Sequence, residues 1–451
     1  MCTLPLMSRC ALAQSNPIIF VTQVPLPDDF ATVNAVFGNH RASIAESGRG
    51  GDLWIRYPNG SLKNLTQAAG FGKSGVQTGS GIAVRDPAVS WDGTKAIFSM
   101  AIGAPEQYDQ TSYVFQLFEV TGLGQSETPK ITKVTNQPLS FNNVMPVYAS
   151  DDQIIFVSDK PIAGASHTYP QRDEYESTDT NTGLWKLNPA TGDLQHLDHA
   201  PSGDFDPIVD SFGRVIFTRW DHLQRDQQNV GAAPGAFNFA SEASRTVTSS
   251  TAEQFPEPRS DEDPDYVPTT NLHTMNQFFP WMVSQSGEGL ETINHIGRHE
   301  LSGYFSQSFN DDPSLEDNYG QYPRLNSAEI DSFLHPHEDP THSGLYLGVN
   351  APEFGSHSAG QLVSIAGAPS VNPEDMALTP LTHPSTSELT DIPSPSHSGL
   401  YRDPLPLSDG TLLAVHTNST QGDVNIGSRG APRSRYSFRI KRLTKSGGYY
   451  V

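Results

Sequence analysis

Several features that mark common classes of protein are missing from this sequence of 451 residues. There are two cysteines, Cys2 and Cys10, and both lie in the first ten residues. No disulfide bond can therefore link distant parts of the chain, and no Cys-x-x-Cys-His motif is present to attach haem covalently. No apolar run approaches the ~20 residues that a membrane-spanning helix needs, so we expect no membrane span.

Basic residues are also scarce. The chain has 28 Lys and Arg against 50 Asp and Glu, which gives a formal net charge of −22 and a pI of about 4.9. Because binding to phosphate backbones depends on an excess of Lys and Arg, we expect no nucleic-acid partner. The acidity fits either a surface that keeps the protein soluble, which we favour, or an acidic recognition surface.

The best-known catalytic signatures are missing as well. The sequence has no Gly-rich phosphate loop and no Gly-x-Ser-x-Gly nucleophile elbow, so serine hydrolase activity has no support. No long segment shows the periodicity of an amphipathic helix. The high counts of Gly (38) and Pro (35) instead favour many turns and short strands.

A short phrase recurs along the chain. It reads "RDPAVSWDGTKAIFSM" at 85–100, "DPIVDSFGRVIFTRW" at 206–220 and "RDPLPLSDGTLLAVHT" at 402–417. In each copy an Asp-Pro pair precedes a Gly at the same spacing, and an apolar run follows that Gly, which indicates an internal repeat. We interpret the Pro as the start of a strand, where no donor is needed, and Asp-Gly as a tight hairpin turn.

Segments of alternating apolar and polar residues complete each repeat and predict about four short antiparallel strands per unit. The units are 17–80, 81–140, 141–203, 204–312, 313–396 and 397–451. Four-stranded units repeated around an axis form a β-propeller, because neighbouring blades bury the faces that a single blade leaves exposed. The predicted fold class is therefore all-β, a six-bladed β-propeller of four-stranded antiparallel blades.

We expect a single propeller domain over residues 17–451, after a signal-like or disordered N-terminus at 1–16. A Ser-, Ala-, Pro- and acid-rich insertion at about 229–268 reads as a loop on one face, or as a lid that orders when a ligand binds. The first unit begins with a segment that corresponds to the second strand of the other units. Blade one is therefore expected either to be incomplete or to gain its innermost strand from a continuation of the chain.

The pattern Asp-Pro-x4-Asp-Gly-x3-apolar with a closing Leu-Thr resembles the TolB-type propeller repeat. Three longer phrases, at 49–66, 212–227 and 399–415, resemble the propeller-bearing middle domain of the hydrazine synthase alpha subunit and its uncharacterised relatives. The resemblance covers most of residues 40–451 and implies a propeller within a larger redox or envelope assembly. It does not imply hydrazine chemistry, because the haem-attachment motif is missing and a shared fold often carries a different activity.

Histidines concentrate toward the C-terminus, where His273 is the first of ten that follow residue 272. The densest stretch is "FLHPHEDPTHSGLY" at 333–346, which the prolines favour as a loop. Imidazole and carboxylate groups at this spacing suit a divalent metal ion, although a polar loop between blades also explains them and is the interpretation that we favour. The candidate ligands in this stretch are His335, His337, Glu338 and His342.

Two further clusters carry ionisable side chains. The stretch "TRWDHLQRD" at 218–226 brings Arg219, Asp221 and His222 together just past a strand. These side chains would form either an acid/base site or, as we favour, a salt-bridge network. In "NHIGRHE", His295 and His299 are four residues apart and would share one face of a helix, but Gly297 weakens that reading of a metal site.

The N-terminal "MCTLPLMSRCALAQSNP" places Ala11-Leu12-Ala13 before Gln14, which matches a signal-peptide cleavage site. We therefore expect export to the periplasm or beyond. Two functions stay open. One is a non-catalytic propeller that binds a protein partner or serves as a scaffold. The other is a metal-dependent propeller enzyme with His and carboxylate ligands in the central channel or funnel.

Overall fold

The computed structural model describes the chain in segments between residues 16 and 451. These are 16–25, 42–44, 50–73, 75, 77, 79, 81–103, 113–160, 182–198, 203–223, 275–293, 330, 332–352, 355–371, 376–423, 427–428 and 431–451, with the backbone alone at 221–223 and 275–277. The regular structure in these segments is nearly all β, and the helical elements α1 (Leu65–Ala68) and η6 (Pro384–Ser387) are short. No helix in the described part is long and apolar enough to cross a membrane.

Six antiparallel sheets follow one another along the chain, and each forms a blade of the propeller. Blades one to three comprise β1 (Ile18–Val21), β2 (Leu53–Arg56) and β3 (Leu62–Asn64); β4 (Ile82–Val89), β5 (Ala96–Ile102), β6 (Gln116–Thr121) and β7 (Lys130–Lys133); and β8 (Asn143–Tyr148), β9 (Ile154–Ser158), β10 (Gly183–Leu187) and β11 (Leu194–His196).

Blades four to six comprise β12 (Gly203–Val209), β13 (Arg214–Leu223), β14 (Met275–Ser284) and β15 (Glu291–Thr292); β16 (Leu334–Glu338), β17 (Leu345–Asn350), β18 (Gln361–Ala366) and β19 (Leu378–Pro380); and β20 (Leu400–Pro406), β21 (Leu412–Thr417) and β22 (Arg439–Arg442). A separate hairpin, β23 (Lys445–Ser446) and β24 (Tyr449–Tyr450), follows blade six. The predicted six-bladed all-β propeller is confirmed.

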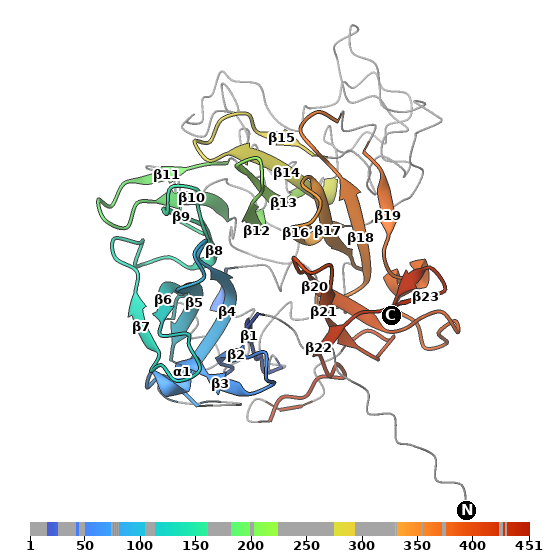
Figure 1. Cartoon of the computed structure of the whole chain (residues 1–451), viewed down its shortest axis with the longest axis horizontal. Coiled ribbons are helices and arrows are strands. Elements are labelled where there is room, and N and C mark those ends of the chain that lie inside the picture. Colours follow the sequence, from blue (N-terminus) through green and yellow to red (C-terminus); the bar gives the residue numbers. More distant parts are fainter. Residues whose placement is uncertain are drawn as a thin grey trace, which may run out of the picture.

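The blades are arranged around a common centre. Figure 1 shows β4, β8, β12, β16 and β20 nearest the middle, with the chain passing from blue to red around the ring. From β4 to β16, each innermost strand packs against the innermost strand of the next blade. The first strand of five repeat units therefore lines the propeller axis, and whatever its side chains carry is brought together there.

The hairpin turns after the innermost strands form as the repeat predicts. In blade two, the amide of Gly93 donates to the carbonyl of Ser90, and the amide of Ser90 donates to the carbonyl of Lys95. Gly93 has a φ of +70°, a conformation that glycine adopts without steric cost. In blade three Asp152 takes the same place with a φ of +62°, so this turn keeps its geometry at some cost in strain.

The proline of the repeat does not lie at a strand start, and that interpretation is wrong. Pro87, Pro146, Pro207, Pro336 and Pro404 lie inside the innermost strands, where the pairing register shifts to form a β-bulge in every blade from two to six. A bulge releases one residue from the hydrogen-bonded ladder, so a residue without an amide hydrogen is tolerated there. The expected loop at 333–346 likewise contains strand β16.

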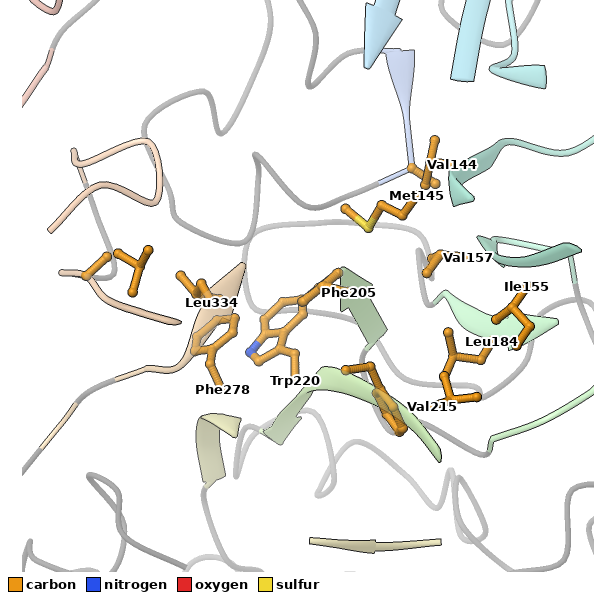
Figure 2. Close-up of a cluster of buried hydrophobic side chains, with 14 of the residues drawn as sticks. Val144, Met145, Ile155, Val157, Leu184, Phe205, Val215, Trp220, Phe278 and Leu334 are labelled. Atoms are coloured by element: carbon orange, nitrogen blue, oxygen red, sulfur yellow. The ribbon is translucent and has the colours of Figure 1, made fainter. Parts of the chain in front are cut away.

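Aromatic side chains of blade four stack on one another in the core that the blades share. The ring of Trp220 stacks on Phe278 with centroids 5.6 Å apart and on Phe205 with centroids 6.3 Å apart. Figure 2 shows these rings beside Leu334 of the next blade. Burying one such side chain stabilises the fold by about 1.5–3 kcal/mol. Phe278 and its neighbour Phe279 are accordingly buried, at 2% and 3% exposed.

A buried polar network also connects blades four and five. The Tyr346 hydroxyl donates to Asp210 Oδ2 at 2.7 Å, and Arg214 Nε donates to the same oxygen at 2.9 Å. Arg214 Nη2 also donates to the Tyr346 hydroxyl at 2.7 Å. Since the Asp210 side chain is fully buried, its charge depends on these partners, and the network fixes how the two blades meet.

Candidate axial site

Five residues form what we call the axial ring: Asp86, Met145, Asp206, His335 and Asp403. Each precedes the bulge proline of its innermost strand, and each has a φ between +48° and +53°. None of these five residues is glycine, so this backbone conformation is strained in each of them. The same strained position therefore recurs in five blades around the axis. The bulges turn these residues out of the sheets and toward one another.

Contacts between neighbouring blades connect the ring residues from blade two through blade six. His335 Nδ1 lies 3.3 Å from Asp206 Oδ2 in blade four and 3.1 Å from Asp403 Oδ1 in blade six. The amide of Asp206 donates to Met145 Sδ at 3.2 Å, and the amide of Met145 donates to Asp86 Oδ2 at 3.1 Å. A bulge residue in the ring therefore reaches both of its neighbours.

Two carboxylates of the ring are supported by the arginine that precedes them. Arg85 Nε donates to Asp86 Oδ2 at 2.6 Å, and Arg402 Nε donates to Asp403 Oδ2 at 2.8 Å. Both guanidinium groups are largely buried and lie over an aromatic ring, that of Phe115 for Arg85 and that of Phe438 for Arg402. The Arg-Asp-Pro sequence in blades two and six thus builds the same ion pair twice.

The electrostatic environment differs between the two Arg-supported carboxylates. Burial raises the pKa of Asp86, with the charge of Asp206 adding to the effect and Arg85 opposing it. Burial also acts to raise the pKa of Asp403, but the charges of Arg402 and His335 outweigh it and hold that pKa below its ordinary value. Asp86 therefore lies in a less well compensated part of the ring than Asp403.

Solvent access also varies around the ring. The Asp403 side chain is 42% exposed and that of Asp86 24%, against 18% for Asp206 and 8% for His335. The carboxylates of blades six and two are thus more exposed to solvent, or to a ligand, than the carboxylate of blade four. These two blades are the neighbours of blade one.

A His–Asp pair adjoins the ring through Arg402. His357 Nε2 lies 2.8 Å from Asp423 Oδ2, and Arg402 Nη1 donates to the His357 carbonyl at 2.7 Å. Asp423 also accepts from Ser434 Oγ at 2.5 Å, so the serine bonds the carboxylate and not the imidazole. This arrangement holds the loop in place and does not activate the serine as a nucleophile.

The histidine-rich stretch that the sequence singled out is divided between different surroundings. His335 lies in the axial ring, whereas Glu338 accepts from Ser211 of blade four and thereby links two blades. His337 Nδ1 lies 3.3 Å from the His335 carbonyl. The His342 side chain is 71% exposed in the hairpin turn. Among the residues that the structure describes, no three His, Cys, Asp or Glu side chains are placed to hold a metal ion.

Of the second cluster, the structure describes Arg219. Its guanidinium forms an ion pair with Asp198 at 3.7 Å and a cation–π contact with the Trp281 ring, whose centre is 4.3 Å away. The backbone of Asp221 and His222 continues strand β13, and their side chains are outside the described residues. His273, His295 and His299, and the insertion at 229–268, are also outside them. A metal role for these residues stays a prediction.

Sequence reasoning assigned the repeat aspartates a local role and missed the ring that they form. The x-Pro pair was visible in five units, but only three of them read Asp-Pro, since Met145 and His335 occupy the position in blades three and five. Alignment on proline instead of aspartate would have placed all five residues at the axis.

Comparison with known proteins shows the fold. No family model matches the chain, and no curated protein matches its sequence. Hydrazine synthase from Kuenenia stuttgartiensis superposes with a TM-score of 0.53 at 13% identity, over 97% of this chain and 44% of that one. A TolB from Acinetobacter baumannii gives a TM-score of 0.34 at 8% identity, over 73% and 49% of the two chains. A putative TolB from Agrobacterium tumefaciens gives 0.27 at 13% identity, over 54% and 56%.

The chain therefore spans less than half the length of the hydrazine synthase chain that it matches. At 13% identity the likeness concerns architecture alone. The chain is a six-bladed β-propeller that is similar in fold to part of the hydrazine synthase chain.

Proposed function

We propose that the protein is an exported binding propeller that holds a basic group of a protein partner at the axial ring. The observation that carries this proposal is the convergence of Asp86, Asp206 and Asp403 at the axis, with Asp403 still 42% exposed. A cation next to Asp86 would offset the cost of its burial and of the nearby Asp206 charge. Binding between preformed side chains on rigid strands also loses little conformational entropy.

Membership of a larger redox or envelope assembly is part of this proposal. Its support is the likeness in fold to hydrazine synthase, of whose chain this protein matches 44%. Export rests on Ala11-Leu12-Ala13 before Gln14, which lie outside the described residues. Fractionation of expressing cells, followed by N-terminal sequencing, tests it. We expect a periplasmic protein that begins near Gln14, and an uncleaved cytoplasmic protein would contradict export.

Binding of a basic group is tested with the peptides Gly-Arg-Gly and Gly-Glu-Gly by NMR titration of the intact protein. We expect Gly-Arg-Gly to bind at least about tenfold more tightly, because rejection of the wrong charge costs more than about 1.4 kcal/mol. Asp403→Asn should abolish the preference. Asp409→Asn, on the exposed turn of the same blade, is the matched control and should keep it. Equal affinity for both peptides would contradict the proposal.

The metal-dependent enzyme remains the alternative. No observation in the described residues favours it, and the histidines at 273, 295 and 299 are outside them. Metal analysis of untagged protein dialysed against Zn²⁺ and Mn²⁺ is the direct test. We expect less than about 0.1 equivalent bound per chain, whereas one tightly bound equivalent would favour the enzyme.

A further inference from the structure

Blade one has three strands in the described part of the chain, and β1 takes the place of a second strand. β1 pairs with β2 along one edge, and no described strand pairs with its other edge. β4 packs against β1 and β2 in the way that β8 packs against β5 and β6 of the preceding blade. The position of an innermost strand therefore lies beside β1, between β20 and β4.

The axial ring defines what a strand in that position would meet. The ring runs Asp86, Met145, Asp206, His335, Asp403 through blades two to six, so the bulge position of blade one falls between Asp403 and Asp86. His335 shows the local rule, because it contacts the carboxylates of the blades on both sides. A residue at the bulge of blade one would likewise have a carboxylate on each side, and these two are the most exposed of the ring.

We propose that the edge of β1 accepts an extended strand from a partner protein, and that this strand carries a basic residue followed by proline at the bulge. The inference rests on the proposed function and specifies the segment that would supply the basic group. The five existing innermost strands define the remaining chemistry: a short strand with an apolar residue on at least one side of the x-Pro pair.

The backbone and the apolar side chains of blade one fit such an addition. An unpaired strand edge offers amide and carbonyl groups in the spacing that an added strand needs, which is the basis of recognition by β-augmentation. Ile19 and Val21 are partly buried against the core of blades one and two. Apolar residues of an added strand would extend that core, and the basic residue would select the partner by charge.

The probe is a fluorescent ten-residue peptide that copies residues 141–150, the innermost strand of blade three, with Met145→Arg. The matched peptide carries Met145→Glu and keeps the proline, and a third carries Met145→Arg with Pro146→Ala. Anisotropy measures binding to the intact chain and to its Asp403→Asn, Asp86→Asn and Asp409→Asn variants. Hydrogen exchange of residues 17–22 reports whether the peptide pairs with β1.

We expect the Arg-Pro peptide to bind at least tenfold more tightly than the Glu-Pro and Arg-Ala peptides and to slow exchange at Ile18–Val21. Asp403→Asn and Asp86→Asn should each weaken binding of the Arg-Pro peptide fivefold or more, and Asp409→Asn should leave it unchanged.

Three outcomes would contradict the inference. If binding depended on the arginine but not on the proline, and β1 exchange did not change, the added strand would be ruled out and the proposed function would still stand. Absence of any charge preference would overturn both. Slow β1 exchange in the free chain, with no peptide bound, would show that the chain's own residues occupy the edge, and would also overturn the inference.

Discussion

The two sides of the axial ring differ in how their charges are satisfied. On the side of blades four to six, His335 lies between two carboxylates, and the Asp210–Arg214–Tyr346 network locks blades four and five together. On the side of blade one, Asp86 is supported by the arginine of its own strand, and Asp403, which also contacts His335, is supported by Arg402. The comparison indicates that one side is built for stability and that the other keeps its carboxylates accessible.

The largest effect should come from the blade interface on the closed side. Arg214→Met leaves the buried Asp210 carboxylate without its cation, and we expect a loss of about 3–5 kcal/mol in the free energy of unfolding. Urea denaturation measures it. Arg439→Met, on an exposed strand, is the control and should change stability by less than about 0.5 kcal/mol. Similar values for the two variants would show that the interface does not depend on the network.

A smaller loss should follow from His335→Leu. This substitution removes the group that lies between Asp206 and Asp403, and we expect about 1–3 kcal/mol of destabilisation, measured in the same way. His337→Leu, two residues away and outside the ring, serves as the control. If His337→Leu cost as much, the effect would come from strand β16 in general and not from the ring.

Asp403 and Asp86 should respond to pH in opposite directions. Because the pKa of Asp403 is lowered in the folded protein, its contribution to stability is present above the ordinary pKa of about 3.8 and is lost as the pH falls below it. Because the pKa of Asp86 is raised, its contribution is present below that value and is lost as the pH rises through the folded pKa.

Unfolding free energies of the wild type and of Asp403→Asn and Asp86→Asn between pH 3 and 7 measure these contributions. We expect Asp403→Asn to reduce the loss of stability at acid pH. Asp86→Asn should instead reduce the loss on the way to neutral pH. Parallel curves for the two variants would contradict the assigned environments.

The smallest effect concerns a turn far from the ring. Asp152 adopts a φ of +62° where the other hairpins of this type have glycine, so Asp152→Gly relieves strain but adds flexibility to the unfolded chain. We expect a net gain of about 0.5 kcal/mol or less, seen as a small rise in Tm, and no change in peptide binding. A marked loss of stability would mean that the Asp152 side chain contributes contacts that outweigh the strain.

The sequence was sufficient to predict the blades, because the hairpin turns and alternating strands are local features. It also indicated that blade one begins with a second strand, which the pairing of β1 with β2 bears out. The axial ring could not be predicted in the same way. His335 meets Asp206 and Asp403 only because the sheets close around an axis, and the bulges that turn these residues inward depend on pairing between strands.

The histidine-rich stretch shows the converse. His335, His337 and His342 are close in sequence, and their spacing suggested a shared ligand set. The bulge at Pro336 and the hairpin turn after β16 send these side chains in different directions. The number of histidines in a short stretch was therefore a weaker guide to the site than the position of each residue within the repeat unit.

Hydrogen exchange of the intact, unliganded chain tests the accessible edge of blade one most directly. The comparison is between β1 and β9, which hold the same place in their blades: β9 pairs with the innermost strand β8, whereas no described strand pairs with the edge of β1 that faces away from β2. We predict that the amides of Ile18–Val21 on that edge exchange at least about 100-fold faster than the amides of Ile154–Ser158 that face β8, because an open edge lacks the second set of backbone hydrogen bonds. Equal protection of the two strands would contradict the account.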